Sequence, residues 1–157
     1  MGRKNSRTCL LDAIIQILPP NIDVVALSAM IEAQMPKEGD TSIMDIKCAL
    51  LEHSLILEVV NKTYIKRGGA AFYLFMETSC RLIVRLRLIN VKKEIMYHFV
   101  AWDGKRVYDS PNDIVIDREK DLTSGQASKM AFGKLYPKTE FFSWQITAVY
   151  RLSQTVP

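Results

Sequence analysis

A histidine and an aspartate that could share a proton lie close together in "YHFVAWDGKRVYDSP", residues 97–111. Asp103-Gly104 between alternating apolar residues is typical of a two-residue β-hairpin loop, because a type I′ turn needs positive φ at both central positions. With these two residues as the loop, His98 lies directly opposite Asp109. Opposite residues of antiparallel strands have Cβ atoms roughly 4.5–5.5 Å apart, so the carboxylate can accept a hydrogen bond from an imidazole N–H. The hairpin therefore predicts a histidine that an aspartate holds in one orientation.

A histidine oriented in this way can serve a nucleophile, and the stretch "NSRTCLLDAI" offers Cys9. Cys9 falls at the predicted start of the first helix, partly exposed, where unpaired N–H groups and the positive end of the helix dipole stabilise a thiolate. Arg7, if it is near, acts in the same direction. The predicted roles are Cys9 as nucleophile, His98 as general base and acid, and Asp109 as the orienting acceptor.

Each of these residue types also has an ordinary structural explanation. A cysteine on an apolar helix is usually a core residue, and this is the interpretation for Cys48 and Cys80, which are predicted to be buried or partly buried. His53 is predicted to be a structural or surface histidine. Asp109 could instead stabilise the turn "DSPND", where Asp and Ser before Pro are common. Cys9 differs from the other cysteines because polar residues precede it at a helix start.

These residues resemble the papain-like cysteine peptidase superfamily, in which a cysteine at the start of an N-terminal helix is followed, after a long gap, by a histidine and an acid on strands. "NSRTCLLDAI" resembles the D-G-x-C-L-F-x-A-I block of ovarian-tumour-type deubiquitinases. The layout "GDTSIMDIKCALLEHSLILEVV…HFVAWDGKRVYDSP" is closer to the bacteriocin-processing and Josephin-like branches, in which small helices follow the nucleophile. The resemblance implies a papain-like fold and a Cys9-His98-Asp109 triad that cleaves a peptide or isopeptide bond through an acyl-enzyme, without metal or organic cofactor.

The sequence departs from this family before the nucleophile. Papain-like enzymes usually place a glutamine there as the oxyanion donor, whereas this chain reads "GRKNSRT". Asn5 is the nearest amide that could replace the glutamine. The alternative is a pair of backbone N–H groups from Cys9 and the loop before it.

Composition indicates one globular domain that spans residues 1–157. Hydrophobic residues make up 48% and charged residues 24% of the chain, enough apolar material for a single core. The three cysteines form no C-x-x-C pair, which argues against a disulfide framework and a zinc site and favours free thiols. No signal peptide or membrane span is recognisable, so an intracellular, cytoplasmic protein is expected.

Hydrophobic periodicity predicts three short helices, then mainly strands, and hence an α+β fold with an antiparallel sheet. The first helix has Leu10, Ala13, Ile14 and Ile17 on one face, and the second has a possible cap at Asp23. Strands are predicted for "LILEVV", "RLIVRLRLI", "EIMYHFVAW", "KRVYDS" and "FFSWQITAVYRL", a helix is predicted around "GQASKMAFGKLY", and "AAFYLFMETS" is ambiguous.

The net charge of +4 is spread along the chain. In "RLIVRLRLIN" arginine alternates with apolar residues, as an edge strand or a half-exposed strand would have it. A nucleic-acid partner is therefore disfavoured, and a polypeptide is the expected substrate, among the candidates a ubiquitin-like protein or a polyprotein. The alternative function is a papain-like module whose catalysis is dispensable and which binds protein partners.

Overall fold

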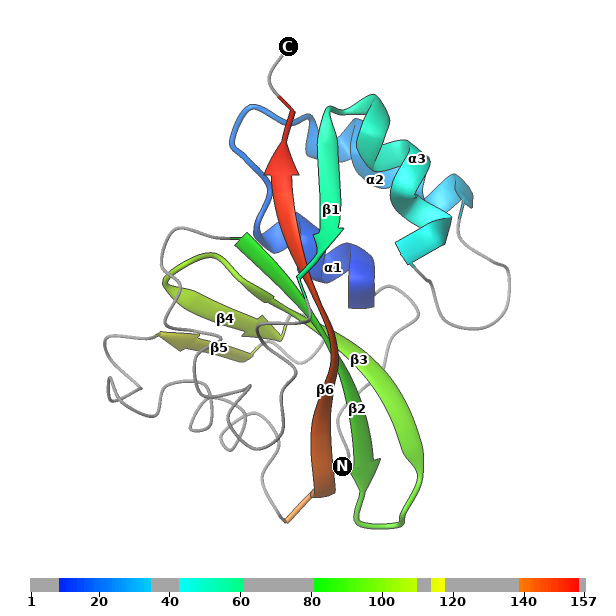
Figure 1. The fold of residues 1–157 in the computed structure, drawn as a ribbon, viewed down its shortest axis with the longest axis vertical. Coiled ribbons are helices and arrows are strands. Elements are labelled where there is room, and N and C mark those ends of the chain that lie inside the picture. The colour runs from blue at the N-terminus through cyan, green and yellow to red at the C-terminus, as the bar shows by residue number, and fades with distance from the viewer. Residues whose placement is uncertain (1–8, 35–42, 61–80, 110–113, 118–138, 156–157) are drawn as a thin grey trace.

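The computed structural model describes residues 9–34, 43–60, 81–109, 114–117 and 139–155, which form an α+β fold. Three helices come first along the chain, and six strands follow them (Figure 1). The elements are α1 (Cys9–Gln16), α2 (Val24–Gln34), α3 (Ile43–Glu52), β1 (Leu55–Val59), β2 (Arg81–Asn90), β3 (Ile95–Trp102), β4 (Arg106–Asp109), β5 (Ile114–Asp117) and β6 (Phe141–Gln154).

The first two helices form where their sequences predict them. In α1 the side chains of Leu10, Ala13 and Ile14 are buried, as their spacing on one helical face requires. The N-terminus of α2 is capped, because the backbone N–H of Ala26 donates to Asp23 Oδ1 at 3.1 Å. Both features confirm the predictions from periodicity and capping.

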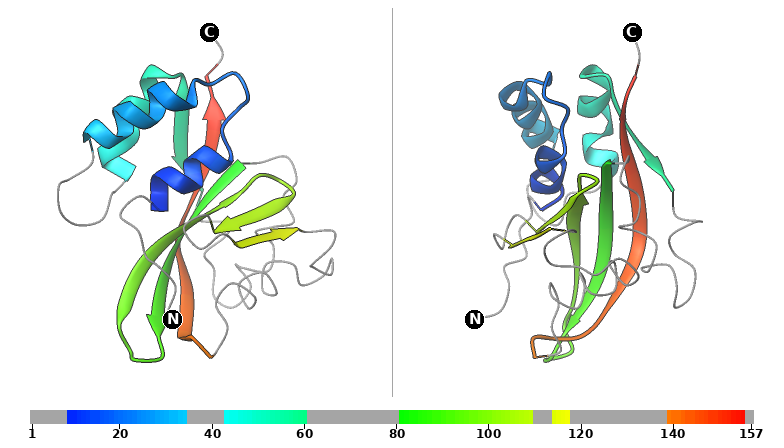
Figure 2. Two further views of the ribbon diagram at one scale, coloured as in Figure 1. Left: turned by 180° about the vertical axis from the view of Figure 1, so that it is seen from behind. Right: turned by 90° about the vertical axis from the view of Figure 1, so that its left-hand side faces the viewer.

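The three helices lie on one side of the sheet and cover only part of it. The side view in Figure 2 shows them in a layer beside the strands, and Figure 1 shows β2, β3 and β6 continuing past that layer. The buried core between helices and sheet contains Cys9, Leu10, Leu11, Ala13, Ile14, Ile17, Leu27, Ile31, Ile46, Ala49, Leu50, Leu55, Ile83, Phe99, Ala101 and Leu152. None of the helices described is long and apolar enough to cross a membrane.

The strands form one antiparallel sheet in the order β1-β6-β2-β3-β4-β5. The last strand in sequence, β6, lies between β1 and β2, so the first and last strands of the described chain are neighbours in the sheet. Strand β2 lies inside the sheet, so the prediction of an edge strand is wrong. Arg85 and Arg87 are half-buried, which confirms the alternative prediction of a half-exposed strand. Strand β5 was not predicted, because its four residues are too short to show a period.

The β3–β4 hairpin corrects the predicted register. Trp102 pairs with Val107, whereas a two-residue loop of Asp103 and Gly104 requires Trp102 to pair with Lys105. Asp103 N donates to the carbonyl oxygen of Arg106 at 3.2 Å, which places Gly104 and Lys105 at the tip. Positive φ occurs there at Gly104 (97°), a residue without a Cβ, whereas a type I′ turn would also impose it on Asp103.

The Asp103 side chain explains why the hairpin prefers this loop. Its Oδ1 accepts hydrogen bonds from the backbone N–H groups of Lys105 at 2.8 Å and Arg106 at 2.7 Å. Its Oδ2 accepts from the Tyr108 hydroxyl at 3.0 Å. An aspartate that accepts hydrogen bonds from turn N–H groups in this way stabilises a turn in which the aspartate is the last residue before the loop. The Asp-Gly pair by itself does not show whether the aspartate lies before the loop or within it.

Some predicted features lie outside the described residues. They are the segments "AAFYLFMETS" and "GQASKMAFGKLY" and the residues Asn5, Arg7 and Cys80.

Candidate active site

A histidine and an aspartate form a buried pair at the meeting point of β3 and β4. His98 Nε2 lies 2.6 Å from Asp109 Oδ1, and the two side chains are 3% and 0% exposed. A charge-assisted hydrogen bond has this short length. The pairing that the hairpin predicted is therefore present.

The pair forms although the predicted register is wrong. In the observed register Asp109 lies opposite Val100, so it is a diagonal neighbour of His98 and not its direct partner. The difference is two residues, and side chains alternate with a period of two, so Asp109 stays on the same side of the hairpin as His98. Diagonal neighbours remain within reach of side chains as long as histidine.

The third predicted residue, Cys9, is the first residue of α1, and its thiol lies close enough to His98 to raise the pKa of the imidazole. Helix α1 packs against β3 and also contacts β4, which explains how a residue near the N-terminus reaches the hairpin. Since Nε2 of His98 is bonded to Asp109, Nδ1 is the ring nitrogen left to face the thiol. Cys9 is only 7% exposed, which corrects the expectation of a partly exposed helix start.

The surroundings of His98 favour its charged form. Burial by itself lowers the pKa of the imidazole, but the hydrogen bond to Asp109, then the hydrogen bond to Cys9, and the charges of both outweigh it and raise the pKa to about 9. His98 is therefore an imidazolium at neutral pH. An imidazolium this deeply buried requires an anionic partner, and the Asp109 carboxylate lies within hydrogen-bonding distance of it.

The second histidine and the second described thiol lie elsewhere. His53 follows α3, is half-buried, and contacts Met30 Sδ through Nε2 at 3.3 Å, in agreement with a structural role. Cys48 is exposed, which corrects the expectation that it is buried or partly buried. It lies on the side of α3 opposite Ile46 and Ala49, which face the core.

Within the ranges that the structure describes, no group of three or more histidine, cysteine, aspartate or glutamate side chains could hold a metal ion. No protein-family model matches the chain, and neither a curated protein nor a solved structure shows significant similarity to it.

Proposed function

We propose that this protein is a cysteine peptidase that cleaves a peptide or isopeptide bond with Cys9, His98 and Asp109. One observation carries the proposal: a buried histidine bonds an aspartate through Nε2 at 2.6 Å and lies close enough to the Cys9 thiol for that thiol to raise the pKa of the ring. A nucleophile, a base that touches it and a third group that orients the base are the parts that covalent catalysis by a thiol requires.

The charge state of His98 suits this chemistry. With a pKa of about 9, the imidazolium is present at neutral pH and can stabilise a Cys9 thiolate, the form of a thiol that attacks a carbonyl. The unpaired N–H groups in the first turn of α1 act in the same direction, since Cys9 is the first helical residue. Asp109 balances the charge that remains on the ring when the thiolate is consumed.

The reaction follows from these positions. The Cys9 thiolate attacks the carbonyl carbon of the scissile bond, and the His98 imidazolium donates its proton to the departing amine as the C–N bond breaks. Neutral His98 then takes a proton from water, whose oxygen attacks the thioester. The C–S bond breaks, a carboxylic acid leaves, and the proton on His98 restores the ion pair.

The edge of β3 beside His98 favours a polypeptide as the substrate. Asp103 N donates to the Arg106 carbonyl, so the odd-numbered residues of β3 direct their N–H and C=O groups toward the β4 side. In the described sheet, β4 ends before it reaches Ile95 and Tyr97, whose backbone groups on that side have no strand partner. An extended substrate backbone can pair there, one residue from His98.

Within the α+β class, we propose that the fold is papain-like. Its supports are the cysteine at the start of α1, the histidine and aspartate on successive strands, and the helices gathered before an antiparallel sheet. Substrate candidates are a ubiquitin-like protein and a polyprotein, both of which present extended segments to a protease. The oxyanion donor is proposed to be Asn5 or the backbone N–H groups around Cys9.

The proposal is tested by brief exposure to iodoacetamide at pH 6, followed by intact-mass analysis and peptide mapping. An ordinary thiol has a pKa near ~8.5, so under about 1% of it is thiolate at this pH. Cys9 should be alkylated much faster than the exposed Cys48, and the adduct should be absent in Cys9→Ala. Cys48→Ala is the matched control and should keep the adduct. Labelling of Cys48 before Cys9 would contradict the proposal.

A second function is favoured by the low exposure of Cys9. A thiol that is 7% exposed gives limited access to a bulky carbonyl, as expected of a papain-like module that binds protein partners without catalysis. The same experiment separates the two functions. Peptidase chemistry requires fast alkylation at Cys9, whereas a binding module requires only the fold.

A further inference from the structure

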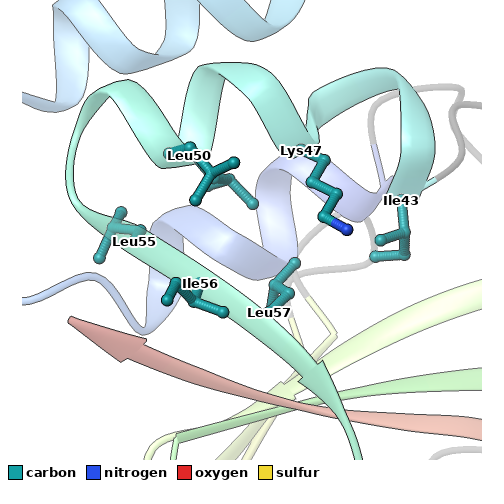
Figure 3. Close-up of a pocket in the computed structure, with 7 residues that line it drawn as sticks. Ile43, Lys47, Leu50, Leu55, Ile56 and Leu57 are labelled. Carbon is teal, nitrogen blue, oxygen red and sulfur yellow. The ribbon is translucent and has the colours of Figure 1, made fainter. Parts of the chain in front are cut away.

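A groove between α3 and β1 lies outside the proposed active site. It is a shallow pocket that is partly open to solvent, and it shares no residue with the triad. Figure 3 shows side chains of α3 and of β1 converging on it, with Lys47 extending from the helix toward Leu57. The lining residues are Ile43, Lys47, Leu50, Leu51, Leu55, Ile56 and Leu57.

The groove runs along an open edge of the sheet. Strand β1 is at the end of the strand order, with β6 as its neighbour on one side. Val60 N donates to the Val149 carbonyl at 2.8 Å, so even-numbered residues face β6. The N–H and C=O groups of Leu55, Leu57 and Val59 then point away from the sheet. In the part of the chain that the structure describes, no strand pairs with them.

Edge strands are usually protected from pairing with another strand, and the described residues of β1 carry few of the sequence features that give such protection. Natural edge strands carry prolines, bulges or many charges that prevent another strand from pairing. Strand β1 reads "LILEV", pairs with β6 without a register shift, and carries Glu58 as its one charge. Around it the apolar side chains of Met44, Leu51 and Val59 are 75%, 50% and 62% exposed. Backbone groups and apolar surface are thus both available to a ligand.

The charge of the groove indicates what the ligand carries. Lys47 is the one charged residue among those that line it, and no lining residue is acidic. A ligand with a carboxylate next to an aliphatic side chain would satisfy both the ammonium group and the leucines.

We propose that the α3–β1 groove binds an extended segment of a partner polypeptide, which adds a strand to β1. The segment pairs its backbone with Leu55, Leu57 and Val59, as in other complexes where a peptide extends a sheet beside a helix. An aliphatic side chain enters between Leu51 and Leu57, and a neighbouring Asp or Glu carboxylate binds Lys47. This inference does not depend on the proposed peptidase activity.

The test begins with selection of a displayed library of random octapeptides on the full-length protein. The selected peptides should contain an aliphatic residue beside an acidic one. Their affinities are then measured by fluorescence anisotropy for the wild type, Lys47→Glu and Lys92→Glu. Lys92 is an exposed lysine in the β2–β3 turn, so its substitution changes the net charge equally without touching the groove.

Lys47→Glu should weaken binding about fivefold to tenfold, since it replaces an attraction by a repulsion at an exposed site, and Lys92→Glu less than about twofold. Methylation of alternate peptide nitrogens should abolish binding, because it removes the donors that pair with β1. Both variants should keep the wild-type rate of Cys9 alkylation, which shows that they fold. Equal effects of the two lysine variants, no selected peptide, or a dimer formed through β1 would each overturn the proposal.

Discussion

The described part of the chain contains two regions in which a cysteine and a histidine occur near a helix, and they differ in burial and in the partners of the histidine. At the junction of α1 and β3, Cys9 and His98 are buried close to each other, and His98 is hydrogen-bonded to Asp109. On α3, Cys48 is exposed, and His53 contacts a methionine sulfur at 3.3 Å. Reactivity is expected in the first region only.

The difference shows that the charge of a buried histidine depends on the groups bonded to its ring. Burial alone would lower the pKa of His98 and leave a neutral ring. Two anionic or potentially anionic partners reverse that effect and raise its pKa to about 9. His53 has no carboxylate within bonding distance in the described structure, only Met30, and a thioether is a weak acceptor.

The largest effect is expected from the nucleophile. Cys9→Ala should abolish peptide cleavage and alkylation at pH 6, while Cys48→Ala should leave both nearly unchanged. Because Cys9 belongs to the core, its replacement also leaves a small cavity, and Cys9→Ser is the closer match in volume. Circular dichroism checks the fold of each variant. If Cys9→Ala is active and Cys48→Ala is not, Cys48 and not Cys9 is the nucleophile.

The next effect concerns the orienting carboxylate. Asp109→Asn should reduce the rate of peptide cleavage about 10- to 1,000-fold, less than in a serine triad, because a thiol gives up its proton more readily than a hydroxyl and depends less on the third residue. The amide can still bond His98 but brings no negative charge. Initial rates at pH 7 measure the loss. Wild-type rates in this variant would assign Asp109 to the turn and not to catalysis.

The raised pKa of His98 predicts that stability depends on pH. Its pKa is about 9 in the folded protein and about 6.5 in an unfolded chain, so the folded state holds the proton more tightly. The stabilisation is fully present below about pH 6.5 and is lost as the pH rises through 9. Since a tenfold change in proton affinity corresponds to ~1.4 kcal/mol, the free energy of unfolding should fall by at most about 3 kcal/mol.

Urea unfolding at pH 6.5 and at pH 9.5 measures this change. In Asp109→Asn the fall in the free energy of unfolding should be much smaller, because the strongest partner of the imidazolium is missing. A stability that rises over this interval would show that His98 is neutral in the folded protein.

The partners of His98 can be ranked by nuclear magnetic resonance. Asp109→Asn should lower the pKa of His98 more than Cys9→Ala does, since the hydrogen bond to Asp109 has the larger effect. The chain has two histidines, so the ring signals are readily assigned, and those of His53 should be the same in all three proteins. The reverse order would make the thiol the dominant partner.

The smallest effect is expected in the second region. His53→Gln removes the contact with Met30, which is half-buried and involves no charge pair, so the free energy of unfolding should change by less than about 1 kcal/mol. Alkylation of Cys9 and peptide cleavage should not change. A tenfold loss of activity in this variant would show that the two regions are coupled.

Much of the local structure could be predicted from the sequence, because it depends on spacing within one element. The buried face of α1, the Asp23 cap of α2 and five of the six strands follow from periodicity and turn chemistry. The choice of His98 and Asp109 as partners also came from one hairpin. The predicted pairing is present although the predicted register was wrong, because the register differs by two residues and each side chain stays on the same side of the hairpin.

The sequence by itself determined which residues can do chemistry and on which elements they lie. Only the tertiary structure decided their surroundings, since these depend on how distant segments pack. Helix α1 contacts β3, which buries Cys9 against His98 although almost ninety residues separate them. Insertion of β6 between β1 and β2 makes β2 central and leaves β1 at the end of the strand order in the described sheet, beside α3. Burial and strand neighbours are properties of the assembled sheet, and no local pattern of side chains encodes them.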